Sequence, residues 1–222
     1  PTIIGHMQNV IDGREIVGVE RGGDPELSHA ANLLYTMTGE RPSAVNERTM
    51  DVSLTLYAEH DFNASTFTSR VIAATLSDLH GALMGAIAAL KGPLHGGANE
   101  AAMDMMNDIR AHVDAGGTVK DFMDKAFAEK RKLMGFGHRV YKNGDHRAPI
   151  LHALGRELAA EKGADSVRLF DLGEEVMSIM LEEKGIHPNV DFPCGMTYFT
   201  MGIPVPQYTP IFVAARTAGW AA

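Results

Sequence analysis

Cysteine is almost missing from this sequence, and its scarcity excludes two kinds of protein. Cys194 is the one cysteine among 222 residues. A single thiol cannot close a disulfide within the chain, and it cannot supply a cysteine-based metal cluster. The count fits a reducing compartment, and we predict a cytoplasmic location.

Excess positive charge and long apolar runs are missing as well. Lys and Arg number 20 against 28 Asp and Glu, which gives a formal net charge of −8 at pH 7. An acidic chain is poorly suited to nucleic acid as its main partner. No run of about 18 uninterrupted apolar residues occurs, so we predict no membrane span. We also find no charged-then-apolar leader with a small-residue cleavage site, although the first residue is Pro1 and not Met.

Alternating β-type patterns are nearly absent, and helical patterns take their place. Helices are predicted over residues 43–60, 98–114, 148–162 and 165–184, with a further helix that starts after Thr118. Thr118 and Asp121 have the spacing of a capping box, and Gly163 and Gly185 are placed to end the last two helices. The run 64–91 is apolar nearly all round, so we expect a buried helix or two helices in line. The predicted fold class is therefore all-α.

Reactive side chains gather where helices are interrupted. The main breaks are GPLHGGANE (92–100), GFGHRVYKNGDHR (135–147) and NVDFPCG (189–195). Glycines flank both His95 and His138, which lets backbone approach a ligand and leaves each imidazole accessible. Asp191 has an apolar setting, which makes a carboxylate a stronger base.

Each of these side chains also has a plain structural interpretation. His95 and His138 can be loop histidines held by backbone carbonyls, and Asp191 can cap a helix that starts after it. His60 can sit at a helix C-terminus for dipole reasons. Arg216, in an apolar run, can be a partly buried arginine that pairs with any acid.

The combination of groups nevertheless favours chemistry at a carbonyl compound. Proton abstraction from a carbon next to a carbonyl needs a base and hydrogen-bond donors, which one carboxylate and several imidazoles can supply. The guanidiniums of Arg147 and Arg216 can bind an anionic second substrate. A helix that starts just after His95 can offer N–H groups to a developing negative oxygen. No HExxH, G-x-S-x-G or P-loop motif is present, so a zinc hydrolase of that type, a serine hydrolase and a P-loop nucleotide site are not indicated.

Four ordered blocks resemble the citrate synthase family. They are HDFNAS from residue 60, GPLHGGAN from 92, GFGHRVYKN-x-D-x-R from 135, and NVDF…GIP…TPIF…ARTAGW from 189. The resemblance implies an acyltransferase that condenses acetyl-CoA with oxaloacetate to give citrate and CoA. 2-Methylcitrate synthase, which uses propionyl-CoA, is the alternative, because one methylene is worth only about 1–3 kcal/mol of discrimination. An inactive fragment or interaction-only relative is the alternative of another class.

The same resemblance assigns roles to individual residues. Asp191 would remove a proton from the acyl-CoA, His95 would hydrogen-bond the thioester oxygen, and His138 would act as acid at the 2-oxo acid carbonyl. The dicarboxylate-binding residues would be His60, Arg147 and Arg216. The coenzyme A-binding residues would be Met134, Gly135, Phe136, Gly137, Lys142 and Asn189, with Asn63, Asn99 and Asn189 in orienting roles. No metal and no permanently bound cofactor is implied, and the expected partners are oxaloacetate, an acyl-CoA and a second copy of the chain.

The family fold implies two helical domains with a cleft that closes around the substrates. We expect residues 1–94 and 204–222 to belong to the large domain and residues 95–203 to form the small domain. Candidate hinges are Gly92, Gly97, Gly135 and Gly202. The chain lacks the family's N-terminal part and C-terminal tail, so we expect an incomplete large domain and poor turnover, or none, from this piece alone. Asp145-His146-Arg147 also departs from the family's usual D-P-R.

Overall fold

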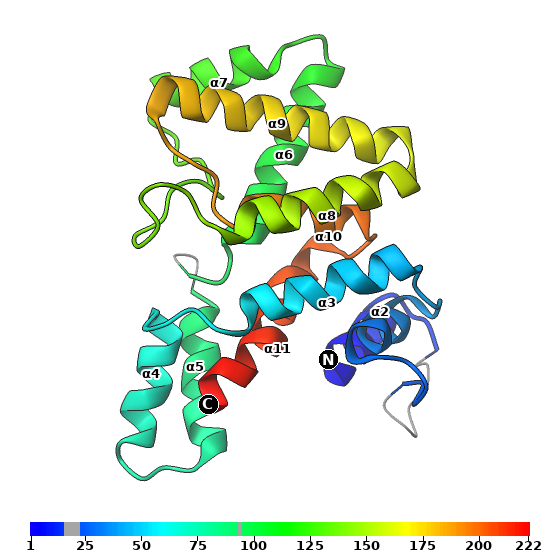
Figure 1. The fold of residues 1–222 in the computed structure, drawn as a ribbon, viewed down its shortest axis with the longest axis vertical. Helices are drawn as coiled ribbons and strands as arrows, with labels where there is room; N and C mark the ends of the chain where they lie inside the picture. Colours follow the sequence, from blue (N-terminus) through cyan, green and yellow to red (C-terminus); the bar gives the residue numbers. More distant parts are fainter. Residues whose placement is uncertain (16–22, 93–94) are drawn as a thin grey trace. The chain divides into compact units, whose positions relative to one another are not determined.

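The structure, a computed structural model, describes residues 1–15, 23–92 and 95–222 (Figure 1). Across these ranges the secondary structure is helical, and the β-type pairing found there is an isolated bridge between Phe136 and Pro188. The predicted all-α class is confirmed. No helix in the described ranges combines the length and the apolar character needed to cross a membrane.

The chain divides into two compact units. Pro1–Gly97 and Pro206–Ala222 form the first, and Ala98–Val205 form the second. These divisions fall close to those expected at 94/95 and 203/204. Assigning the units to the large and small domains of the family stays a prediction.

The first unit is built from six α-helices within the described ranges. They are α1 (Thr2–Ile11), α2 (His29–Thr38), α3 (Ala44–Ala58), α4 (Ala64–Ala73), α5 (Leu79–Leu90) and α11 (Tyr208–Ala221), the last preceded by the 3-10 helix η2 (Val205–Gln207). Four of them begin at side-chain caps, in which Ser28, Ser43, Asn63 and Asp78 accept a hydrogen bond from a backbone N–H in the first turn. α11 packs on α3 and α5, and α2 packs on α1 and α3.

The run 64–91 differs from its prediction of a buried helix or two helices in line. It forms two helices, α4 and α5, that lie side by side in a hairpin (Figure 1). The turn contains neither Gly nor Pro, and Leu76 occupies it with a φ of 66° and 95% exposure. The missed signal is Asp78, which caps α5 by accepting from the Gly81 N–H at 2.7 Å. Much of the apolar surface of this hairpin is exposed.

The second unit contains α6 (Ala98–Asp114), α7 (Val119–Ala128), α8 (Arg147–Lys162), α9 (Ala164–Lys184) and α10 (Asp191–Thr200). These helices confirm the predictions for 98–114, 148–162 and 165–184, and the capping box of Thr118 and Asp121 is present. Gly163 and Gly185 follow α8 and α9 at positive φ, as their sequence positions predicted.

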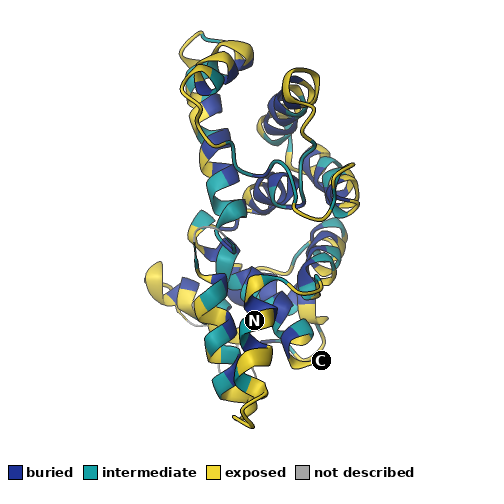
Figure 2. Ribbon diagram, turned by 90° about the vertical axis from the view of Figure 1, so that its left-hand side faces the viewer, coloured by how far each residue is buried: buried dark blue, intermediate teal, exposed yellow. Residues whose placement is uncertain are grey.

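α10 is the central helix of the second unit. It packs on α8 and α6, and residues 192–198 are all buried. A Cβ on Gly155 of α8 would lie 2.4 Å from the Thr197 hydroxyl, so the close approach of these helices requires glycine there. Figure 2 shows the resulting pattern, in which individual helices carry a buried side and an exposed side.

Candidate active site

The predicted site residues are divided between the two units. His60, His95 and Arg216 belong to the first, and His138, Arg147 and Asp191 belong to the second. The convergence of these side chains on one cleft stays a prediction, and each group is described within its own unit.

His95 is held through its Nε2 atom by the first turn of α4. Nε2 lies 2.8 Å from the Ser65 Oγ and accepts a hydrogen bond from the Ser65 backbone N–H at 3.3 Å. A ring nitrogen that accepts from an amide carries no proton, so the neutral imidazole has its proton on Nδ1. Burial, and then the positive charge of Arg216, lower the pKa of His95 from 6.5 to about 4. His95 is therefore a neutral donor of Nδ1–H at physiological pH.

Ser65 is the hub of the contacts that hold His95, and sequence reasoning gave it no role. The residue is 0% exposed. Its hydroxyl accepts from the Trp220 indole N–H at 3.2 Å and lies 2.7 Å from the Asn63 Oδ1, which caps α4. Ser65 and Trp220 each end one of the recognised blocks, HDFNAS and ARTAGW, which was the signal available in the sequence.

Arg216 is a buried cation on α11. It is 2% exposed, its Nε donates to the Tyr57 carbonyl at 2.7 Å, and its guanidinium carbon lies 4.9 Å from the centre of the Phe212 ring. A carbonyl and an aromatic face both stabilise a positive charge. His60 follows the end of α3 and is half-buried, and its carbonyl accepts from the Asn63 side chain at 3.1 Å, so the predicted position at a helix end is confirmed.

His138 of the second unit has the opposite tautomer from His95. Its Nδ1 accepts from the backbone N–H groups of Val140 and Tyr141, at 3.1 and 3.2 Å. The neutral ring must then carry its proton on Nε2, which becomes the donor. The Tyr141 ring stacks on the imidazole with centroids 4.7 Å apart. The backbone turn after His138 thus fixes both the tautomer and the plane of the ring.

Asp191 is the first residue of α10 and is half-buried. The N-cap residue is Val190 and no side-chain cap hydrogen bond is present there, so the interpretation of Asp191 as a cap is wrong. The backbone N–H of Asp191 donates to Asn189 Oδ1 at 3.0 Å. Asp191 therefore lies in the first turn of α10, beside the N-terminal end of the helix dipole.

The glycine-rich loop before His138 is tied to the segment that leads into α10. The Asn189 N–H donates to the Gly135 carbonyl, the Asn189 side chain donates to the Gly137 carbonyl, and the Gly137 N–H donates to the His187 carbonyl, each at 2.9 Å. Gly135 has a φ of 83°, and a Cβ there would lie 2.8 Å from the Phe192 Cβ. Gly135 is required both for its backbone conformation and for this close approach.

The remaining residues predicted to bind coenzyme A are also in the second unit. Met134 and Phe136 are half-buried, and Lys142 is exposed. The Phe136 ring packs on Phe192, with centroids 4.6 Å apart.

Arg147 begins α8 and pairs with Asp145, a residue that received no role from the sequence. The Arg147 backbone N–H and Nε donate to Asp145 Oδ1 at 3.0 Å each, and Nη2 donates to Oδ2 at 2.8 Å. Burial acts to raise the pKa of Asp145, but hydrogen bonds and charge from Arg147, together with the Val190 N–H, lower it on balance. Asp145 therefore stays ionised and holds the guanidinium in place.

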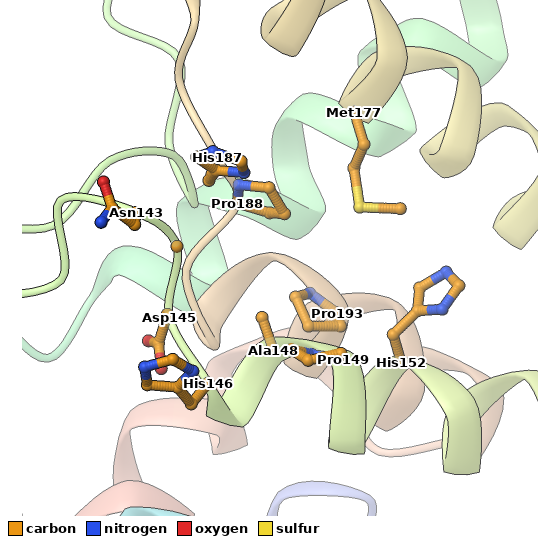
Figure 3. Close-up of a pocket in the computed structure, with 11 residues that line it drawn as sticks. Asn143, Asp145, His146, Ala148, Pro149, His152, Met177, His187, Pro188 and Pro193 are labelled. Atoms are coloured by element: carbon orange, nitrogen blue, oxygen red, sulfur yellow. The ribbon is translucent and has the colours of Figure 1, made fainter.

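A cavity of ≈ 360 Å³ lies beside this pair in the second unit (Figure 3). Its walls come from the loop around Asn143, the start of α8, Met177 on α9, and the segment His187–Pro188. His138 and Asp191 do not line it, so it is distinct from the predicted catalytic groups. His146, the departure from D-P-R, is exposed and borders this cavity.

Known proteins of one family match this chain over nearly its whole length. The family model for the citrate synthase C-terminal domain matches residues 1–222. A citrate synthase of Heyndrickxia coagulans is 44% identical over 224 residues, which cover 99% of this chain and 56% of that protein. 2-Methylcitrate synthase 1 of Corynebacterium glutamicum is 48% identical over 216 residues, which cover 95% of this chain and 54% of that protein.

Solved structures agree in fold. The crystal structure of citrate synthase from Thermotoga maritima MSB8 has a TM-score of 0.84 and 37% identity, and the match covers 99% of this chain and 58% of that one. A citrate synthase from Thermoplasma acidophilum, in a ternary complex with carboxymethyl coenzyme A and oxaloacetate, has a TM-score of 0.86 and 33% identity over 99% of this chain and 57% of that one. The chain belongs to the citrate synthase family. It spans about half the length of the curated relatives it matches.

Proposed function

We propose that the protein containing this chain condenses acetyl-CoA with oxaloacetate and hydrolyses the resulting thioester to citrate and CoA. The observation that carries the proposal is the pair of fixed imidazole tautomers. His95 presents Nδ1–H and His138 presents Nε2–H, which are the two donors that the reaction needs. The Thermoplasma acidophilum relative, whose structure holds carboxymethyl coenzyme A and oxaloacetate, supports the choice of substrate class.

The proposed mechanism starts at the acyl-CoA. The Asp191 carboxylate takes a proton from the carbon next to the thioester, while His95 Nδ1–H hydrogen-bonds the thioester oxygen on which negative charge develops. A neutral imidazole suits this step: its pKa of about 4 keeps the ring uncharged, and an uncharged ring gives the developing oxygen a hydrogen bond without transferring its proton. The activated carbon then forms a bond to the carbonyl carbon of oxaloacetate.

The second half of the reaction uses the other imidazole and the cations. His138 Nε2–H donates a proton to the former carbonyl oxygen of oxaloacetate, which becomes the hydroxyl of a citryl thioester, and the proton that Asp191 took from the acyl-CoA then restores the neutral His138 ring. Arg147 and Arg216, with His60, hold the carboxylates, for which guanidinium is the matching donor. Met134 to Gly137, Lys142 and Asn189 receive coenzyme A. Water then cleaves the thioester and releases CoA, and no metal or permanently bound cofactor takes part.

2-Methylcitrate synthesis from propionyl-CoA is the second candidate. Relatives of both kinds match at similar identity, at 44% for the citrate synthase of Heyndrickxia coagulans and 48% for the 2-methylcitrate synthase of Corynebacterium glutamicum. The test is kcat/KM of the full-length protein for the two thioesters at saturating oxaloacetate. A ratio of tenfold or more in favour of acetyl-CoA supports the proposal, and the reverse ratio assigns the second function.

An inactive relative is the remaining alternative, and calorimetric measurement of oxaloacetate binding distinguishes it from an active enzyme. The proposal requires the full-length protein to bind oxaloacetate and release thiol from an acyl-CoA. A well-folded protein that binds no oxaloacetate and releases no thiol would refute it. The 222-residue piece alone is expected to turn over poorly, since relatives are about twice as long.

We also propose a cytoplasmic homodimer that associates through the α4–α5 hairpin. The support is apolar surface on this hairpin, where Phe67, Val71, Leu79, Met84 and Ile87 are between 41% and 71% exposed. Exposed apolar patches of this kind mark protein contacts. Met84→Asp should shift the full-length protein from dimer to monomer in sedimentation, and an unchanged dimer would exclude this surface.

A further inference from the structure

The Asp145 side chain is a buried charge that the reaction itself does not use. It is 0% exposed, and four donors surround it: the N–H, Nε and Nη2 of Arg147 and the backbone N–H of Val190, at 2.8–3.0 Å. A buried carboxylate is costly unless hydrogen bonds compensate it. Here both oxygens are engaged, so the group is held rigidly.

These donors come from two different segments of the second unit. Arg147 is the first residue of α8, and Val190 is the N-cap residue of α10, 45 positions from Asp145 in the chain. Val190 directly precedes Asp191. One carboxylate therefore links the guanidinium to the backbone from which the proposed base projects. Asp145 and the start of α8 can be followed in Figure 3.

The pairing also determines how Arg147 can meet a ligand. Asp145 occupies the Nε and Nη2 edge of the guanidinium, so a ligand carboxylate would have to approach from the Nη1 side. A paired arginine has less net attraction for an anion than an isolated one. The ion pair with Asp145 reduces the net positive charge at Arg147 but fixes the orientation of its guanidinium, as expected where the geometry of the bound substrate limits the rate.

We propose that Asp145 is a positioning residue for condensation, which orients Arg147 toward the dicarboxylate and, through Val190, places Asp191. The proposal rests on the proposed function. Asp145 would have two separable effects. Through Arg147 it would raise the affinity for oxaloacetate, and through the start of α10 it would raise kcat.

The test is a double-mutant cycle in the full-length protein, with oxaloacetate affinity measured by calorimetry and kcat by thiol release. Asp145→Asn should weaken oxaloacetate binding about tenfold in the wild-type background. In the Arg147→Ala background it should weaken binding less than twofold, because the residue through which it acts is gone. kcat should fall at least tenfold in both backgrounds.

Asp171→Asn is the matched control, because Asp171 also pairs with an arginine of the second unit, Arg156, away from the proposed site. It should leave affinity and kcat within twofold. Asp145→Glu is the second variant. It keeps the charge but cannot satisfy Arg147 and Val190 together, so affinity should stay within threefold while kcat falls.

Several results would overturn the proposal. The first is an Asp145→Asn effect on oxaloacetate affinity that is equal in both backgrounds, and the second is an unchanged kcat. The third is loss of folding in both Asp145 variants, judged by thermal unfolding, because Asp145 would then be a structural residue. A wild-type protein that binds no oxaloacetate would instead refute the proposed function.

Discussion

Replacing Ser65 by alanine tests how His95 is held. The Ser65 hydroxyl contacts His95 Nε2 at 2.8 Å and accepts from the Trp220 indole N–H at 3.2 Å, while the Ser65 backbone N–H makes a separate bond to the same Nε2. Ser65→Ala removes the hydroxyl and keeps the backbone bond. The Nδ1–H tautomer of His95 should therefore survive, but the ring should lose its positional restraint.

The size of the effect follows from these contacts. The indole N–H of Trp220 would be left buried without its acceptor, at a cost of about 1–3 kcal/mol in the free energy of unfolding. For a chain of 222 residues, that corresponds to a fall in Tm of roughly 2–12 °C, and to a smaller fall in the longer full-length protein. A catalytic group displaced by even a fraction of an ångström loses much of its effect, so we expect kcat to fall roughly 10- to 100-fold.

The assay is thiol release by the full-length protein at saturating acetyl-CoA and oxaloacetate, with Tm measured in parallel. Trp220→Phe is the matched variant, because it removes a different partner of the same hydroxyl and leaves the contacts of Ser65 with His95 and Asn63. It should lower Tm but reduce kcat much less than Ser65→Ala does. A Ser65→Ala protein whose kcat stays within twofold of wild type would rule out this role of Ser65, and so would an equal loss of kcat in both variants.

Three further predictions concern the other charged and titratable groups. Asp191→Asn should reduce condensation at least a thousandfold while oxaloacetate affinity by calorimetry stays within threefold; a large loss of affinity would contradict its role as the base. Arg147→Ala should weaken oxaloacetate binding at least tenfold, and unchanged affinity would exclude it from the anion site. Because burial lowers the pKa of His95 to about 4, the unfolded chain binds more protons between pH 6.5 and 4. The stability that comes from the neutral His95 should therefore be fully present above pH 6.5 and be lost as the pH falls toward 4. In denaturant titrations, the free energy of unfolding of His95→Asn should fall less steeply over this range; an equally steep fall would refute the low pKa of His95.

Local sequence signals predicted much of the helical framework. The Thr118–Asp121 capping box, Gly163 and Gly185 all work through backbone groups within a few residues, so their effect is readable in the sequence. α1 and α2 were not predicted, and the run 64–91 was predicted wrongly. Its apolar residues are distributed all round, so periodicity gave no direction for packing and did not reveal the turn at Leu76.

The candidate site residues were named from their blocks, but their partners were not. His95 is held by Ser65, 30 positions away, and Val190 is held by Asp145, 45 positions away. Ser65 and Asp145 both lie inside recognised blocks, but a serine in a first helical turn and an aspartate in a loop are common, so the sequence did not show which side chains they hold.

The sequence by itself determined the all-α class and the family and named the candidate reactive side chains, because each of these depends on residue types at short spacing. Only the tertiary structure decided which nitrogen of each imidazole carries the proton. In His138, Nδ1 accepts from the backbone N–H groups of Val140 and Tyr141, so the proton is on Nε2. In His95, Nε2 accepts from the backbone N–H of Ser65 in the first turn of α4, so the proton is on Nδ1. A tautomer is set by the donor that reaches the ring in the folded chain, and the composition of the loop does not specify that donor.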